Sequence, residues 1–193
     1  MPTMSDRRQK ISALSLVSDL ATMDQALYET VTVTRTPALD TALRRLSAAA
    51  DHSKISFAVA AGLALCGRRP RRAAAMGVAA VGVASATANL LGKRLVRRPR
   101  PHRAEDSPFP GRHVPMPDSA SFPSGHTASA VAFAAAVGPA FPVAAVPLGL
   151  LACAVGYSRV HTGVHYPGDV VAGALLGTGS AALIVALASR ADV

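Results

Sequence analysis

The stretch SRVHTGVHYPGD, residues 158–169, places polar side chains between two strongly apolar segments. Without partners there, such groups would cost roughly 2–7 kcal/mol each, so we expect them to form a site. His165 is a candidate nucleophile, because imidazole titrates near neutral pH. Asp169 could accept the Nδ1 proton of His165, which would present Nε2 for attack.

Two further stretches could bind a phosphate beside this nucleophile. Phosphoryl transfer needs cations and N–H donors around the nonbridging oxygens. Lys93 and Arg100 lie in KRLVRRPRP, and Arg159 lies in the first stretch. The sequence PSGH, residues 123–126, precedes an apolar stretch that we expect to be helical, so its N–H groups would lie at an anion-binding helix N-terminus.

Three residues of PSGH have separate expected roles. Gly125 would let the backbone approach the phosphate closely, and Ser124 would add a hydroxyl donor. His126 could protonate the leaving oxygen and later activate water.

Each stretch also has a simpler interpretation. A basic cluster after a membrane span can be a positive-inside anchor. PSGH can be a turn that opens a helix, and His165 with Asp169 can be a capping pair. A shared site is favoured because each stretch supplies a different part of one reaction.

The motifs Lys93-x6-Arg100-Pro101, PSGH and Ser158-Arg159-x5-His165-x3-Asp169 resemble the three signature motifs of the type 2 phosphatidic acid phosphatase (PAP2) family. This superfamily also includes bacterial acid phosphatases and vanadium-dependent haloperoxidases. The resemblance covers residues 93–169 and the helices that carry them, and no signature covers residues 1–54. Several motifs in the right order are far more specific than one motif alone.

The resemblance implies a phosphohistidine on His165, with His126 as acid and then base and Asp169 orienting His165. It implies no metal and no other cofactor. His161 and His102 match no motif position and are expected to be neighbours of the site. The phosphate-binding residues that it implies are Lys93, Arg100, Ser124, Gly125 and Arg159.

The resemblance further implies metal-independent hydrolysis of a lipid phosphate monoester or diphosphate, such as the polyprenyl-linked decaprenylphosphoryl-5-phosphoribose. Phosphatidic acid, phosphatidylglycerol phosphate and undecaprenyl diphosphate stay open as substrates. A vanadate-dependent haloperoxidase is a different class, disfavoured because those proteins are larger and soluble. A non-enzymatic lipid-binding protein with a relic site is disfavoured by the intact motifs.

Composition predicts an all-α integral membrane bundle, and the resemblance implies a PAP2/haloperoxidase-like core. Half of the residues are hydrophobic, only 4% are aromatic, and small residues are abundant, which is typical of helices packed closely in lipid. We expect about five spans of roughly 20 residues. They are a helix beginning near 51–54, residues 73–92, two helices within 127–157 joined near GPAFP, and residues 170–189. Membrane members of the family typically have one span more.

The first part of the chain is different in character. Residues 11–28 and 37–50 are expected to be amphipathic helices that lie against the membrane or the bundle, although a pair of soluble core helices is the alternative. Asp19 and Asp24 interrupt the first of them, which argues against a signal peptide. We therefore divide the chain into an amphipathic N-terminal region, 1–54, and a PAP2-type membrane phosphatase domain, 55–193.

Charge and cysteine placement exclude several other classes. The net charge is +9, but the basic residues lie between apolar runs, which disfavours nucleic-acid binding. Cys66 and Cys153 lie in apolar stretches without metal-ligand spacing, and we expect them to be small core residues.

If the spans alternate in direction, 15 of the 20 Lys and Arg residues fall on the side of the membrane that carries the candidate site. The positive-inside rule then places this site at the cytoplasmic face of the cell membrane. Nothing in the sequence indicates an oligomeric state.

Overall fold

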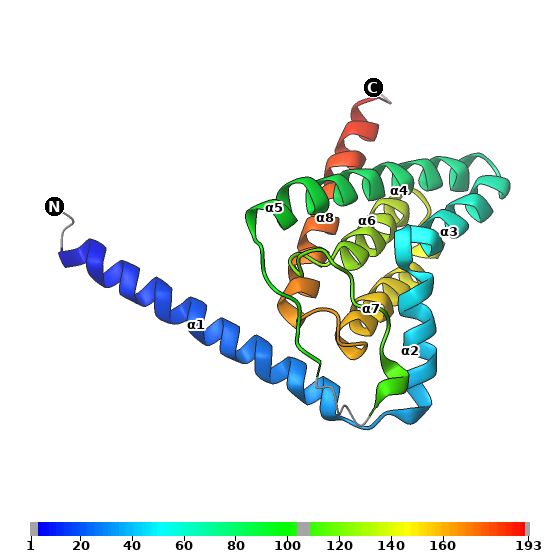
Figure 1. The fold of residues 1–193 in the computed structure, drawn as a ribbon. Coiled ribbons are helices and arrows are strands. Elements are labelled where there is room, and N and C mark those ends of the chain that lie inside the picture. The colour runs from blue at the N-terminus through cyan, green and yellow to red at the C-terminus, as the bar shows by residue number, and fades with distance from the viewer. Residues whose placement is uncertain (1–3, 104–108, 192–193) are drawn as a thin grey trace.

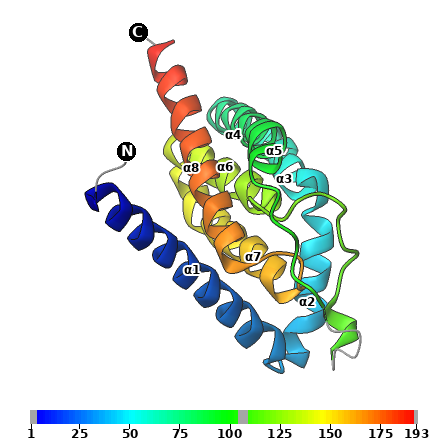
Figure 2. The ribbon, with the colours of Figure 1, turned by 60° about the vertical axis from the view of Figure 1, so that its left-hand side comes forward.

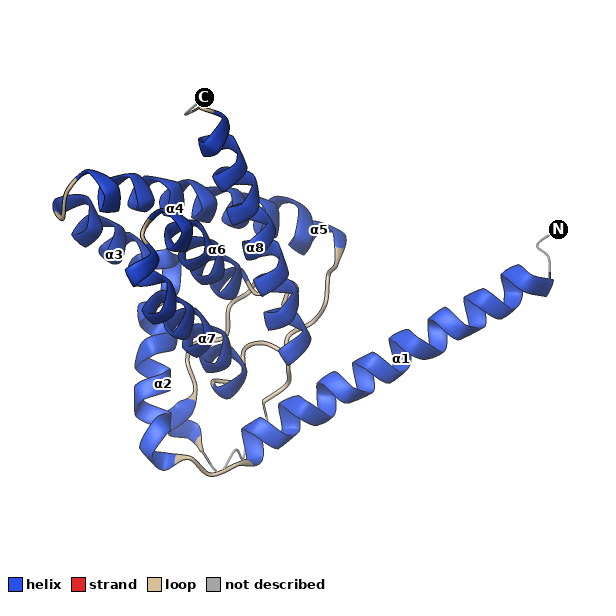
Figure 3. Cartoon of the chain, turned by 180° about the vertical axis from the view of Figure 1, so that it is seen from behind, coloured by secondary structure: helices blue, strands red, loops and turns tan. Residues whose placement is uncertain are grey.

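The computed structural model describes residues 4–103 and 109–191, and the described residues form helices and no strand (Figures 1 and 3). This confirms the all-α prediction. Residues 104–108 of the long polar loop lie outside the described residues. The helices are α1 Met4–Val33, α2 Pro37–Ala49, α3 Lys54–Leu65, α4 Arg68–Ala86, α5 Lys93–Leu95, α6 Gly125–Ala140, α7 Ala145–His161 and α8 Pro167–Arg190.

Helix α6 lies at the centre of the bundle and packs against α4, α7 and α8 (Figure 1). Small side chains make this close packing possible, because they let helix backbones approach one another. A Cβ atom at Gly173 of α8 would lie 2.5 Å from the carbonyl oxygen of Ser124. One buried apolar cluster of this packing consists entirely of alanines: Ala80, Ala84, Ala128, Ala132, Ala136 and Ala181.

Three helical segments of the described chain are long and apolar enough to cross a membrane: Arg68–Leu95, Pro142–His161 and Pro167–Arg190. They include three of the five expected spans. The other two expected spans correspond to α3, with 12 residues, and α6, with 16 residues. Both are shorter than the roughly 20 residues that a bilayer requires. The count of about five spans therefore stays a prediction.

The two helices expected in the N-terminal region are present. Helix α2 packs against α7, and α1 extends from the bundle as a long rod (Figure 2). Several apolar side chains of α1 are exposed: Leu16, Val17, Leu20, Met23 and Leu27. That α1 and α2 lie against a membrane, and that a domain boundary falls at residue 54, stay predictions.

The prediction that both cysteines are core residues is wrong, because Cys66 and Cys153 are exposed. Cys66 follows the last residue of α3, and Cys153 lies on the outward side of α7 next to buried Ala152. The outer surface of a membrane bundle is itself apolar. An apolar neighbourhood in the sequence therefore does not distinguish the interior of this fold from its surface.

Candidate active site

One cavity of about 470 Å³ collects residues that are far apart in the sequence. Lys93 comes from α5 at the end of the α4 segment, and Arg100 from the loop that follows it. The other predicted site residues that line it stand at the first turn of α6, the last turn of α7 and the α7–α8 connection, and residues within 48–53 and 114–119 contribute further wall. Six of the eight predicted site residues line the cavity: Lys93, Arg100, Gly125, His126, Arg159 and His165.

His165 presents its two ring nitrogens to different neighbours. Nε2 lies 3.3 Å from Nη1 of Arg100 on the cavity side. On the opposite side, Nδ1 lies 3.5 Å from Oδ2 of Asp169 and 3.4 Å from Oγ of Ser121. Burial lowers the pKa of His165 to about 4, although the contact with Asp169 acts against this. The imidazole is therefore neutral at pH 7, with a lone pair available for attack.

Asp169 is fully buried behind His165 in the first turn of α8. Its Oδ2 accepts hydrogen bonds from Oγ of Ser121 and, at 3.0 Å, from the backbone N–H of Tyr166. Its Oδ1 accepts one from Nη1 of Arg98 at 3.0 Å. Asp169 thus caps α8 and faces His165 at once, so the two interpretations of this pair are compatible.

The three predicted cations also connect parts of the fold. Lys93 donates to Oγ of Ser119 at 3.1 Å. Arg100 donates from Nε to the carbonyl oxygen of Ser119 at 2.8 Å and from Nη1 to that of Val164 at 2.8 Å. Arg159 is 1% exposed and donates from Nη1 to Oγ of Ser47 in α2 at 2.6 Å. Its Nε has no partner among the described residues.

The first turn of α6 places Gly125 and His126 at the cavity wall. The first N–H groups of a helix have no acceptor within the helix, so they are available to an anion. Ser124 differs from the prediction, because it does not line the cavity. Its hydroxyl accepts a hydrogen bond from Thr127 at 3.0 Å, and its backbone N–H donates to the carbonyl oxygen of Asp169 at 2.9 Å. Ser124 thus ties α6 to α8.

Several residues that contact the site were not identified from the sequence. Asp51 lies 2.7 Å from Nε2 of His126, and Ser121 bonds Asp169. Arg98 bonds Asp169 and also, at 2.7 Å, Asp24 of α1. Two of these residues left a signal in the sequence: Asp24 as a charge that interrupts an apolar pattern, and Arg98 as a member of the basic stretch KRLVRRPRP.

Of the histidines outside the motifs, His161 and His102 do not line the cavity, whereas His52 does. His161 is fully buried, with Nε2 located 2.9 Å from Oδ1 of Asp40, and His102 is exposed. Among the residues that the structure describes, no group of three or more His, Cys, Asp or Glu side chains could hold a metal ion.

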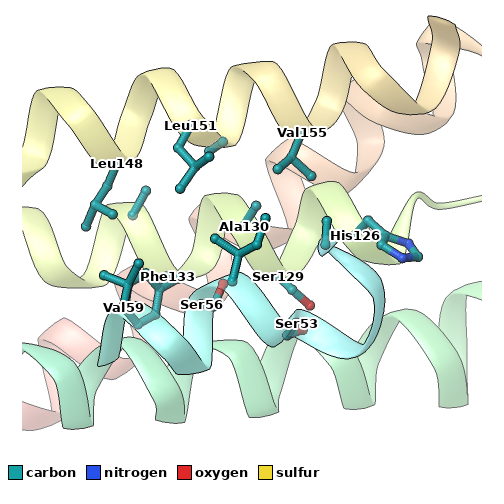
Figure 4. A pocket seen from close by; sticks show the side chains of 14 residues that line it. Ser53, Ser56, Val59, His126, Ser129, Ala130, Phe133, Leu148, Leu151 and Val155 are labelled. Carbon is teal, nitrogen blue, oxygen red and sulfur yellow. The ribbon is translucent and has the colours of Figure 1, made fainter. Parts of the chain in front are cut away.

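A narrow apolar crevice of about 20 Å³ lies next to the cavity, between α3, α6 and α7 (Figure 4). Both spaces share His126 and Ser129 in their walls. Besides Ser53 and Ser56, the crevice is lined by aliphatic and aromatic side chains, among them Val59, Phe133, Leu148, Leu151 and Val155. The cavity is therefore bordered on this side by tightly packed apolar side chains of the bundle interior.

Comparisons with known proteins agree with this geometry. Residues 73–192 match the model of the PAP2 superfamily. The chain is 41% identical over 121 residues to the decaprenylphosphoryl-5-phosphoribose phosphatase of Mycobacterium tuberculosis. The aligned residues are 60% of this chain and 62% of that protein. The enzyme of the same name from Mycolicibacterium smegmatis is 38% identical over 141 residues, which are 71% of this chain and 72% of the relative. A lipid A 1-phosphatase of Rhizobium johnstonii is 42% identical over 98 residues, or 47% of this chain and 37% of the relative. The match thus spans less than two thirds of the M. tuberculosis and Rhizobium proteins.

Two solved structures have a similar fold. A transmembrane PAP2 type phosphatidylglycerolphosphate phosphatase from Bacillus subtilis gives a TM-score of 0.71 at 22% identity, with coverage of 89% of this chain and 87% of the other. Aquifex aeolicus LpxE gives a TM-score of 0.67 at 25% identity, with coverage of 83% and 93%.

Proposed function

The chain belongs to the PAP2 superfamily, and from this premise we propose that it hydrolyses the phosphate ester of a membrane lipid through a phosphohistidine on His165. The observation that carries the proposal is the position of Nε2 of His165, 3.3 Å from the Arg100 guanidinium in a cavity that Lys93 and Arg159 also line. A phosphate held by these cations lies next to the nucleophile.

The first step transfers the phosphoryl group to the enzyme. Nε2 of His165 attacks phosphorus, the phosphorus–oxygen bond to the lipid breaks, and His126 gives its proton to the leaving oxygen. The contact of Asp169 and Ser121 with Nδ1 holds the proton on that nitrogen, so that Nε2 carries the lone pair. Arg100, Lys93 and Arg159 stabilise the charge on the equatorial oxygens.

The second step releases phosphate and restores the enzyme. His126, now neutral, takes a proton from a water molecule as that water attacks phosphorus. The phosphorus–nitrogen bond breaks, inorganic phosphate leaves, and His165 is again neutral. Both steps balance without a metal or a redox cofactor.

A lipid substrate is supported by the relatives, whose names specify a polyprenyl-linked phosphoribose and lipid A. We propose a polyprenyl-linked phosphate as the first substrate to test, because the two proteins named for it match the larger shares of this chain. The uneven distribution of basic residues supports a site at the cytoplasmic face of the cell membrane.

Phosphate release by the purified protein in detergent tests the proposal. The panel contains decaprenylphosphoryl-5-phosphoribose, phosphatidic acid, phosphatidylglycerol phosphate and undecaprenyl diphosphate, each assayed with and without EDTA. We expect release from at least one lipid, inhibition by vanadate, no effect of EDTA, and no turnover by His165→Ala. Turnover by His165→Ala near the wild-type rate would refute the nucleophile, and peroxide-dependent halide oxidation by the vanadate-loaded protein would favour the haloperoxidase class instead.

A further inference from the structure

Asp51 brings a carboxylate from the N-terminal region into the cavity. Its Oδ1 lies 2.7 Å from Nε2 of His126 and 3.9 Å from Nη1 of Arg159. The side chain is 45% exposed and forms part of the cavity wall. Asp51 lies outside residues 73–192, which match the family model, and outside the three motifs.

The backbone around Asp51 follows an unusual path. His52 and Ser53 have φ values of 56° and 58°, and residues other than glycine rarely adopt this left-handed conformation. Two consecutive residues of this kind are costly and persist only where the surrounding structure holds them. Here they turn the chain from α2 into α3 within the single 3₁₀ turn Asp51–Ser53, which keeps Asp51 against the first turn of α6.

We infer that Asp51 is a positioning residue that orients His126 for proton transfer, an inference that rests on the proposed function. With Nε2–H donated to Asp51, Nδ1 is left for the proton exchanged with the leaving oxygen. Burial lowers the pKa of His126 to about 4, and the negative carboxylate acts against this by stabilising the imidazolium from which that proton comes. The arrangement repeats, on the leaving-group side, the relation of Asp169 to His165.

Two substrates with different leaving groups separate this role from a structural one. The alcohol of dodecyl phosphate must be protonated as it leaves, whereas p-nitrophenyl phosphate releases a stable anion without a proton. For Asp51→Asn we expect kcat/KM to fall about tenfold or more on dodecyl phosphate, within the roughly 100- to 10,000-fold that an acid–base group supplies. On p-nitrophenyl phosphate kcat/KM stays close to wild type. Asp51→Glu, which keeps a carboxylate, restores part of the loss on dodecyl phosphate.

Asp40→Asn is the matched control, because it removes the other aspartate–histidine pair of the N-terminal region. Asp40 contacts His161 at 2.9 Å and Arg112 at 3.1 Å, and none of these residues lines the cavity. Folded Asp40→Asn should keep the wild-type ratio of the two rates. Two results would overturn the role of Asp51 but leave the proposed function standing. One is an equal loss of kcat/KM on both substrates in Asp51→Asn, and the other is a kcat/KM of Asp51→Glu on dodecyl phosphate no higher than that of Asp51→Asn. A wild-type protein that hydrolyses neither these substrates nor any lipid of the panel would overturn the proposed function and, with it, this inference.

Discussion

The guanidinium of Arg98 and the carboxylate of Asp169 form an ion pair, with Nη1 located 3.0 Å from Oδ1, directly behind the proposed nucleophile. Asp169 is fully buried, whereas 26% of the Arg98 side chain is exposed. Arg98 also lies 4.0 Å above the ring of Tyr166 and bonds Asp24 of α1. The pair therefore links the N-terminal region to the residue that orients His165.

Asp169→Asn should reduce kcat strongly without emptying the phosphate site. The amide can still accept hydrogen bonds but no longer favours the Nδ1–H tautomer of His165, and we expect a loss of roughly 100- to 10,000-fold. Vanadate affinity, measured by inhibition or by equilibrium binding, should change little because Asp169 does not line the cavity. An unchanged kcat would reduce Asp169 to a cap of α8.

Arg98→Gln should weaken both the fold and the reaction, because it leaves the buried carboxylate of Asp169 without its cation. We expect the free energy of unfolding to fall by roughly 1–3 kcal/mol, with a smaller loss of kcat than in Asp169→Asn. Arg97→Gln is the control, since Arg97 is an exposed neighbour. If both variants lose the same activity and stability, general loss of positive charge explains the effect and the ion pair does not.

The stability of the fold should decrease as the pH falls from about 6.5 to about 4, because burial lowers the pKa of both His165 and His126 to about 4. In the folded protein each pKa is about 4, so the unfolded chain binds the extra protons throughout this interval. The stabilisation is complete above the unfolded pKa and disappears toward pH 4, an effect of roughly 3 kcal/mol at most for each histidine. Apparent unfolding midpoints of wild type and His165→Asn in detergent test this. The variant should lose less stability on acidification, and an equal loss would contradict the assignment. His102→Gln, at an exposed position, should behave as wild type.

Gly173→Ala should destabilise the bundle by roughly 1–3 kcal/mol. The added methyl group would lie 2.5 Å from the Ser124 carbonyl oxygen and would displace the first turn of α6, so activity should fall as well. Gly179→Ala on the same helix meets nothing within 4 Å and serves as the control for helix propensity. Thermal unfolding and phosphate release are measured for both variants. Equal unfolding temperatures and equal activities would mean that α6 and α8 can move apart without loss of stability or activity.

The proposed orientation can be tested with two thiols at opposite ends of the bundle. Cys66 is exposed at the end of α3 that lies away from the cavity, since α3 begins beside Asp51 and α4 returns to Lys93. A Cβ atom at Gly111, in the loop on the cavity side, would have no neighbour within 4 Å, so this position tolerates a cysteine. In intact cells carrying Cys153→Ala, a membrane-impermeant maleimide should label Cys66. The second variant carries Gly111→Cys together with Cys66→Ala and Cys153→Ala, and its thiol should react only after permeabilisation. The reverse labelling pattern would place the site outside the cell.

The sequence alone was sufficient for the helices and for most of the chemistry. Apolar stretches bounded by Gly, Pro and charged residues predicted five helices of the bundle, because these patterns are local properties of the chain. The motif order predicted that Lys93, His126 and His165 meet at one site, and they line one cavity. Their catalytic roles remain to be tested by the variants above.

Only the tertiary structure decided which other side chains reach those groups. Asp51 and Arg98 contact His126 and Asp169 over separations of 75 and 71 residues, and such contacts depend on turn and loop geometry that carries no local pattern. The structure also turned the Ser124 hydroxyl toward Thr127 rather than the cavity. It placed Cys66 and Cys153 on the outer surface, because a bundle suited to lipid is apolar on both sides of its helices and hydrophobicity no longer separates inside from outside.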